Sequence, residues 1–223
     1  MIELRGLTKS YVTPKGRHYV FKDLNAILPE NKSIAILGKN GAGKSTLLRI
    51  IGGIDFADSG KVITNKTISW PVALSGGFQG SLTARQNVRF VARLYLSSED
   101  EVDQVIDFVE SFADIGKYFD MPIKSYSSGM RGRIGFGLSM AFNFDYYLLD
   151  EAGAVGDANF RKKSQALLDE LKQKSNIIMV SHDLNDLTRN CDVAFLMRDG
   201  QAEYFEDVAQ AIEVYKAYAV NNK

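Results

Sequence analysis

The sequence has a single cysteine, Cys191, and only four prolines among its 223 residues. One cysteine cannot form a disulfide within the chain, which excludes a small disulfide-stapled scaffold and fits a reducing compartment. Its expected role is that of a small buried hydrophobic residue. There is no low-complexity linker and no repeat period. The chain is therefore expected to form one domain.

The sequence also lacks a net charge and a long apolar run. Lys plus Arg and Asp plus Glu both total 27. The chain therefore lacks the basic excess that would predict binding to nucleic acid or to an acidic membrane. The longest stretch free of charged residues, 67–84, includes Pro71 and Gln79. It is no membrane span, which needs about 20 predominantly apolar residues. The N-terminus has no secretory signal pattern, so any membrane role is expected to be peripheral.

Apolar material is plentiful, because 45% of the residues are hydrophobic, which is enough for one sizeable core. Apolar residues in 2–4 and 20–27 predict antiparallel strands that open the fold. The continuous apolar run 33–37 is typical of a strand buried on both faces of a parallel sheet. Later segments alternate between helix and strand patterns: helix at about 85–117 and 134–142, strand at 144–149, helix at about 160–174, strand at 177–180 and a closing helix at 208–220. The pattern predicts an α/β fold with a mainly parallel core sheet.

The strongest motif is a glycine-rich loop between the predicted strand 33–37 and the helical run 47–51. It satisfies G-x-x-x-x-G-K-[ST] with Gly38, Lys39, Asn40, Gly41, Ala42, Gly43, Lys44, Ser45 and Thr46. Glycines let backbone N–H groups surround an anion, and the new helix presents its positive end. Lys44 would neutralise phosphate charge and Ser45 would offer an oxygen to Mg²⁺. The flanking strand and helix argue against an ordinary glycine turn.

Polar residues follow two of the later strands, and open α/β sheets bind ligands at that edge. Asp150 suits a metal ligand, directly or through water, and the adjacent Glu151 suits a general base. Without the phosphate loop, this acidic pair would be interpreted as a helix start or a solvated turn. His182 follows the strand at 177–180, where an imidazole could reach a terminal phosphate, although a lone histidine is more often structural.

The order of these motifs resembles the nucleotide-binding domain of ATP-binding-cassette transporters over nearly the whole chain. Gln79 resembles the glutamine of the loop that contacts metal and water and senses the membrane partner in that family. Asp157 resembles the aspartate of the D-loop, in an unusual setting, and His182 resembles the switch histidine. The resemblance implies a P-loop cassette over 1–223. It would have a RecA-like core at about 1–84 and 144–223, an antiparallel β subdomain, and a helical subdomain at about 85–143.

A Ser-Gly motif at 126–130 resembles the family's Leu-Ser-Gly-Gly-Gln sequence. Ser127 and Gly129 are kept, and these are the two positions with which the family holds the γ-phosphate. Ser128 replaces the first glycine and Met130 replaces the final glutamine. The alternative is an ordinary helix cap before Arg131.

Tyr11 lies where the family places an aromatic residue that stacks on adenine. Any aromatic ring can stack on a base. Plain packing is the alternative for Tyr11, and Tyr19 is a rival for the stacking role.

Four segments, 52–60, 68–71, 76–88 and 126–130, resemble the ATPase subunits of bacterial capsular polysaccharide exporters. The resemblance implies binding of ATP with Mg²⁺ and hydrolysis that drives export across the inner membrane. It also implies a homodimer on the cytoplasmic face of that membrane and a separate permease. The permease is expected to dock on the surface around 79–88. No nucleic acid partner is implied. Only 41 residues follow His182, too few for the carbohydrate-binding domain of some O-antigen exporter ATPases.

Other functions stay open at this stage. The nearest is the ATPase of a related exporter of O-antigen, teichoic acid or another cell-surface glycan. A soluble cassette ATPase of translation or repair would usually carry two cassettes or a long insertion. A P-loop kinase or GTPase would not need the Ser-Gly motif with a switch histidine. Intact Lys44, Asp150 and Glu151 argue against a scaffold that does not hydrolyse ATP.

Overall fold

The computed structural model describes residues 1–72, 77–150 and 157–220. The chain divides into two compact units. The first, called the core unit, comprises 1–71, 144–151 and 171–223. The second, called the helical unit, comprises 72–143 and 152–170.

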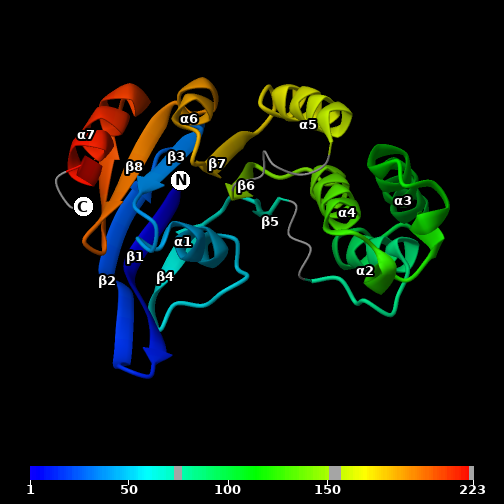
Figure 1. The fold of residues 1–223 in the computed structure, drawn as a ribbon, viewed down its shortest axis with the longest axis horizontal. Coiled ribbons are helices and arrows are strands. Elements are labelled where there is room, and N and C mark those ends of the chain that lie inside the picture. Colours follow the sequence, from blue (N-terminus) through cyan, green and yellow to red (C-terminus); the bar gives the residue numbers. More distant parts are fainter. Residues whose placement is uncertain (73–76, 151–156, 221–223) are drawn as a thin grey trace. The chain divides into compact units, whose positions relative to one another are not determined.

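A three-stranded antiparallel sheet opens the core unit. Its strands, in the order β2-β1-β4, are Gly16–Leu28, Ile2–Thr13 and Ser59–Thr64. In Figure 1, β1 and β2 are the long blue strands near the N-terminus. The predicted antiparallel strands are thereby confirmed, and both are longer than their alternating apolar residues indicated.

The second sheet of the core unit has six strands in the order β5-β6-β7-β3-β8-β9. Its first five strands are parallel, and β9 runs antiparallel to β8 at one edge. All five residues of β3 are buried, as the run 33–37 predicted. The strands are β3 (Ile34–Gly38), β5 (Ile68–Pro71), β6 (Tyr146–Asp150), β7 (Asn176–Val180), β8 (Val193–Arg198) and β9 (Gln201–Phe205). The α/β fold with a mainly parallel core sheet is confirmed.

Strand β6 begins two residues later than predicted. Asp145 accepts hydrogen bonds from the backbone N–H and the hydroxyl of Thr67, at 2.7 and 2.8 Å. This side-chain pairing holds Asp145 just before the strand, so that the ladder with β7 starts at Tyr146. The aromatic residues at 144–149 correctly indicated a strand but did not reveal this boundary.

Three helices belong to the core unit: α1 (Lys44–Ile51), α6 (Leu184–Asn190) and α7 (Val208–Val220). Helix α7 contacts β3 and β8 and lies beside β8 in Figure 1, which confirms the predicted closing helix. Leu47 and Leu48 of α1 are buried in one hydrophobic cluster with residues of β1, β2, β3, β6, β7 and β8. This cluster anchors the helix that follows the glycine-rich loop.

The helical unit contains α2 (Ala84–Tyr95), α3 (Glu99–Ala113), α4 (Ser128–Met140) and α5 (Ala158–Leu171), with short 3₁₀ turns at Gly116–Asp120 and Ile123–Ser125. The predicted helical block 85–117 is confirmed, with a break between α2 and α3. Helix α4 starts six residues before the predicted 134. Its first turn lacks apolar spacing, and a serine cap begins it instead. Helix α5 spans 158–171 rather than 160–174.

Phenylalanines form the centre of the helical unit. Phe112 of α3 stacks on Phe136 of α4, with ring centroids 5.6 Å apart. Phe160 of α5 meets Phe112 edge-on at 5.3 Å and Phe136 at 6.0 Å. Such aromatic pairs each contribute about 0.5–1.5 kcal/mol beyond the area they bury. They fix α3, α4 and α5 against one another.

A backbone seam joins two loops of the helical unit. The N–H groups of Ile123 and Lys124 donate to the carbonyls of Leu82 and Gly80, both at 2.9 Å. An isolated antiparallel bridge extends the pairing by one step. The seam connects the segment after the predicted glutamine loop to the segment before the Ser-Gly motif.

No helix in the described part of the chain is both long enough and apolar enough to cross a bilayer.

Candidate nucleotide-binding site

The glycine-rich loop has the backbone that its motif predicts. Gly38, Gly41 and Gly43 have φ angles of 151°, 82° and 92°. A Cβ at Gly43 would lie 2.3 Å from Cγ1 of Val20, and one at Gly38 would lie 2.7 Å from the carbonyl oxygen of Met197. Glycine is therefore required at these two positions both for backbone conformation and for space.

Lys44 begins α1 and is buried. Its Nζ donates to the carbonyl oxygens of Gly38 at 2.8 Å and of Lys39 at 3.0 Å. The loop thus holds the ammonium with its own backbone, beside the N-terminus of α1. A charge fixed in this way needs little reorganisation to meet an incoming phosphate.

Ser45 and Asp150 lie side by side at the carboxyl edge of the sheet. The Ser45 hydroxyl donates to Oδ1 of Asp150 at 3.0 Å. Mg²⁺ prefers oxygen ligands and is commonly bound by one or two protein groups together with substrate phosphates and water. The hydroxyl and the carboxylate fit this donor set, so Ser45 and Asp150 would hold Mg²⁺, directly or through water.

A cavity of about 520 Å³ brings the predicted residues of the core unit together. It is lined by Tyr11, His18, Val20, Asn40, Gly41, Gly43, Lys44, Ser45, Thr46 and His182. Tyr11 and His182, which are 171 positions apart, therefore border the same space as the phosphate loop. Tyr19, the rival aromatic, lines a neighbouring cavity with Lys39 and Ala42, and the Lys22 ammonium lies 3.8 Å from the centre of its ring.

Sequence reasoning missed His18. It lies on β2 and lines both cavities. It belongs to no motif, and its only signal was that the chain has just two histidines.

Gln79 lies in the helical unit, and its backbone is held by a residue that the sequence analysis did not select. The Gln79 N–H donates to Oδ1 of Asn87 at 2.8 Å, and Nδ2 of Asn87 donates to the carbonyls of Gln79 at 3.2 Å and Thr83 at 2.9 Å. Asn87 is buried on the same face of α2 as Ala84, Val88 and Ala92. A polar residue in that apolar stripe was the available signal.

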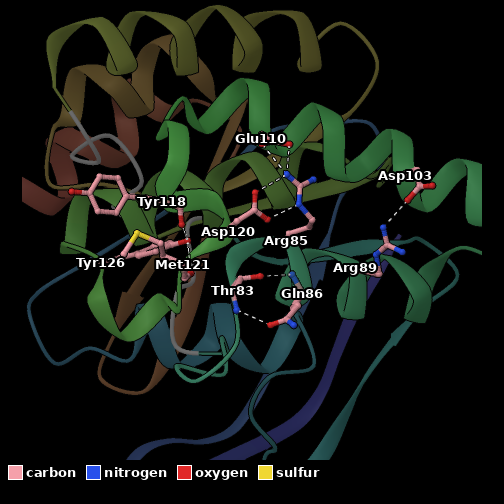
Figure 2. Close-up of polar contacts among 10 residues, drawn as sticks. All are labelled: Thr83, Arg85, Gln86, Arg89, Asp103, Glu110, Tyr118, Asp120, Met121 and Tyr126. Atoms are coloured by element: carbon pink, nitrogen blue, oxygen red, sulfur yellow. Dashed lines mark hydrogen bonds and ion pairs between the residues drawn. The ribbon is translucent and has the colours of Figure 1, made fainter.

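Ser127 is the N-cap of α4. Its Oγ accepts a hydrogen bond from the Met130 N–H at 3.2 Å, and both Ser127 and Ser128 are exposed. The preceding Tyr126 is buried, and its hydroxyl donates to the carbonyls of Tyr118 and Met121 (Figure 2). The capping alternative for the Ser-Gly motif is therefore present, and Tyr126 fixes the start of the helix. Gly129 follows within the first turn.

Asp157 directly precedes α5 in the helical unit. Its Oδ1 accepts from the Phe160 N–H at 2.9 Å, and its Oδ2 pairs with Arg133 at 2.7 Å. The hydrogen bond from Phe160, together with the Arg133 charge, lowers the pKa of Asp157. The structure thus gives this carboxylate a local role at the helix start. Glu151, the predicted general base, lies outside the described residues.

Comparison with known proteins identifies the family. A family model described as "ABC transporter" matches residues 21–154. The chain belongs to the ABC transporter family. It is 62% identical over 219 residues to the polysialic acid transport ATP-binding protein KpsT of Escherichia coli, covering 98% of this chain and 97% of that protein.

A second relative of the ABC family is the capsule polysaccharide export ATP-binding protein CtrD of Neisseria meningitidis serogroup B, 42% identical over 217 residues, covering 97% of this chain and 99% of that protein. The fold matches the ATP-binding cassette MJ0796 in a dimeric post-hydrolysis state bound to ADP and Pi, with a TM-score of 0.76 at 24% identity, covering 93% and 99% of the two chains. The predicted resemblance to ATPase subunits of capsule exporters is confirmed, and this ABC chain is an ATPase subunit.

Proposed function

We propose that this chain is the ATP-binding and hydrolysing subunit of a transporter that exports capsular polysaccharide across the bacterial inner membrane. The observation that carries the proposal is the cavity where Tyr11, Lys44, Ser45 and His182 border one space, with Asp150 bonded to Ser45. The cargo class is supported by the 62% identity to a polysialic acid transport protein and the 42% identity to a capsule polysaccharide export protein.

Each residue has a defined task in this proposal. Residues 38–46 hold the phosphates with backbone N–H groups, and Lys44 contributes its charge. Tyr11 stacks on adenine. Ser45 and Asp150, with Gln79, hold Mg²⁺, which when bound neutralises charge on the β- and γ-phosphates.

Four residues have further roles around the γ-phosphate during hydrolysis. Glu151 takes a proton from the attacking water. Gln79 contacts that water, and His182 reaches the γ-phosphate. Asp157 contributes the family's D-loop contact.

Two copies of the chain are proposed to share their sites. Each phosphate loop would face Ser127, Ser128 and Gly129 of the other copy, where the capped start of α4 presents its positive end to phosphate. A separate integral-membrane permease would supply the pore and dock around 79–88, holding the dimer peripherally at the cytoplasmic face of the inner membrane. No nucleic acid partner is proposed. The chain is proposed to form a single cassette, with a core at about 1–84 and 144–223 and a helical subdomain at about 85–143.

The test is removal of the gene followed by complementation. We expect the deletion strain to retain capsular polysaccharide inside the cell, and the parental chain to restore it to the surface. Lys44→Ala should fail to restore export at equal expression, because the phosphates lose their fixed cation. Retention of O-antigen or teichoic acid instead would support the related-exporter alternative. Normal surface glycan in the deletion strain would contradict the proposal.

A further inference from the structure

Lys9 and Asp55 contact Tyr11 at the edge of the nucleotide cavity. Lys9 lies two residues before Tyr11 on β1 and is only 8% exposed. Its Nζ donates to Oδ1 of Asp55 and to the carbonyl of Phe56, both at 2.7 Å. The Tyr11 hydroxyl donates to the other carboxylate oxygen of Asp55 at 3.4 Å. The Lys9 ammonium also lies 5.2 Å from the centre of the Tyr11 ring.

Asp55 is itself held in place by the segment that follows α1. The N–H groups of Ile54 and Asp55 both donate to the carbonyl of Arg49, at 2.9 and 3.2 Å. The Phe56 N–H donates to Oδ1 of Asp55 at 2.7 Å. The carboxylate is therefore attached to the far end of the helix that begins at the phosphate loop.

The pair stays charged under ordinary conditions. The hydrogen bond to Asp55 raises the pKa of Lys9, and the same bond lowers the pKa of Asp55. A buried ammonium is costly unless it is paired and hydrogen-bonded, and the carboxylate with the Phe56 carbonyl meets that need. Asp55 has one oxygen left for Tyr11, so the hydroxyl end and one face of the ring are both approached by fixed charges.

We propose that Lys9 and Asp55 are positioning residues that hold the Tyr11 ring ready to receive the base of a nucleotide. This rests on the proposed function, in which ATP binds in the cavity that Tyr11 lines. Tyr11 is 44% exposed, so without these contacts its ring could leave the stacking position. A ring held in advance does not lose that freedom on binding, and affinity for the base rises accordingly.

Binding of ATP and of inorganic tripolyphosphate by the full chain tests the proposal. Tripolyphosphate reports the phosphate loop alone, whereas ATP reports the loop and the base. In Asp55→Ala and Lys9→Met, the Kd for ATP should rise about 3- to 10-fold, as expected for partial loss of base stacking. The Kd for tripolyphosphate should change by less than about twofold. Turnover should show a raised KM for ATP with kcat retained.

A double-mutant cycle gives the decisive readout. In a Tyr11→Ala background, Asp55→Ala should have no further effect on the ratio of the two Kd values. Glu3→Gln is the matched control, since it weakens an exposed ion pair with Arg5 on the same strand and should leave both Kd values unchanged. If Asp55→Ala does not fold, Asp55→Asn and Tyr11→Phe test the same contacts with smaller expected shifts in the ratio.

Two results would overturn the inference while leaving the proposed function intact. One is an equal loss of ATP and tripolyphosphate affinity in the Asp55 variants, which is the mark of a general structural role. The other is a further loss of ATP affinity when Asp55→Ala is added to Tyr11→Ala. A parental chain that binds ATP no more tightly than tripolyphosphate would instead overturn both the base site at Tyr11 and this inference.

Discussion

The hydroxyl of Ser45 donates to Oδ1 of Asp150 at 3.0 Å, although the two residues lie 105 positions apart. They meet because β3 and β6 are both paired with β7 in a parallel sheet, and the carboxyl ends of all three strands lie at one edge. A hydroxyl and a carboxylate are thereby placed beside the phosphate loop. This pair of side chains is the most direct structural support for a Mg²⁺ site beside the phosphate loop.

Asp150→Asn should lower Mg²⁺ affinity by roughly 10- to 100-fold, because the amide keeps the shape of the side chain but loses its charge. The measurement is ATP affinity as a function of Mg²⁺ concentration. Affinity measured in excess chelator should not fall, since the phosphate loop is unchanged. Asp145→Asn is the control, because Asp145 precedes the same strand and bonds Thr67. Equal Mg²⁺ dependence in the parent and Asp150→Asn would exclude the metal role.

Glu151→Gln should leave ATP binding intact and lower hydrolysis by about 10² or more, because the amide cannot accept a proton from water. Steady-state phosphate release by the assembled transporter provides the measurement. Hydrolysis close to that of the parent would place the base on another residue.

Dimers with Lys44→Ala in one copy and Ser127→Arg in the other test the shared site. If each site uses both copies, both changes fall in one site and the second site stays whole. In a Glu151→Gln background, such dimers should trap roughly one ATP each. Complete loss of trapping, with dimerisation and folding verified, would argue for sites confined to single copies.

Gly43→Ala and Gly41→Ala should differ in stability. Both glycines have positive φ, which costs an alanine about 1–2 kcal/mol. At Gly43 the new Cβ also meets Val20, whereas nothing lies within 4 Å of a Cβ at Gly41. We therefore expect Gly43→Ala to cost roughly 2–4 kcal/mol in unfolding free energy, and Gly41→Ala about 1 kcal/mol. Urea unfolding would compare them, and equal losses would contradict the steric argument.

The ion pairs of Arg85 should make the helical unit sensitive to acid. Arg85 bonds Glu110 and Asp120 (Figure 2), and its hydrogen bond lowers the pKa of Asp120 from the ordinary value of 3.8. The resulting stabilisation is complete above about pH 4 and is lost as pH falls through the lowered pKa. Because Asp120 is 58% exposed, the effect should stay below about 1 kcal/mol.

Arg85→Met should therefore show a shallower loss of stability than the parent below pH 4, measured by thermal unfolding across pH. Glu3→Gln serves as a control for removing an exposed ion pair elsewhere. An unchanged acid slope in Arg85→Met would mean that Asp120 gains nothing from the guanidinium.

Local sequence signals predicted much of the core unit and of the cavity. The glycine pattern predicted the conformation of 38–46, and polar residues after strands predicted that Asp150 and His182 reach the same edge as the loop. These predictions depend only on the conformational preferences of neighbouring residues and on the rule that the carboxyl ends of parallel strands lie at one edge of the sheet.

Other features depend on contacts between distant segments, which no local pattern records. Asp55 meets Lys9 and Tyr11 only because the chain returns to β1 after α1. In the sequence, Asn87 is not distinguished from the other residues of an amphipathic helix. Its role depends on its hydrogen bonds to Gln79, which the structure shows. The first turn of α4 lacks apolar spacing, so its true start depended on the Ser127 cap. Strands β4, β5, β8 and β9 were likewise not predicted.

The seam between 80–83 and 122–124 is made of main-chain atoms, since the N–H groups of Ile123 and Lys124 bond the carbonyls of Leu82 and Gly80. Exchange of these side chains leaves such bonds in place, and among the amino acids only proline lacks the N–H they need. The connection can therefore persist through extensive divergence in the residues that form it. These hydrogen bonds depend on the length and path of the backbone. An insertion or deletion within 80–83 or 122–124 would therefore disturb them more than most point substitutions.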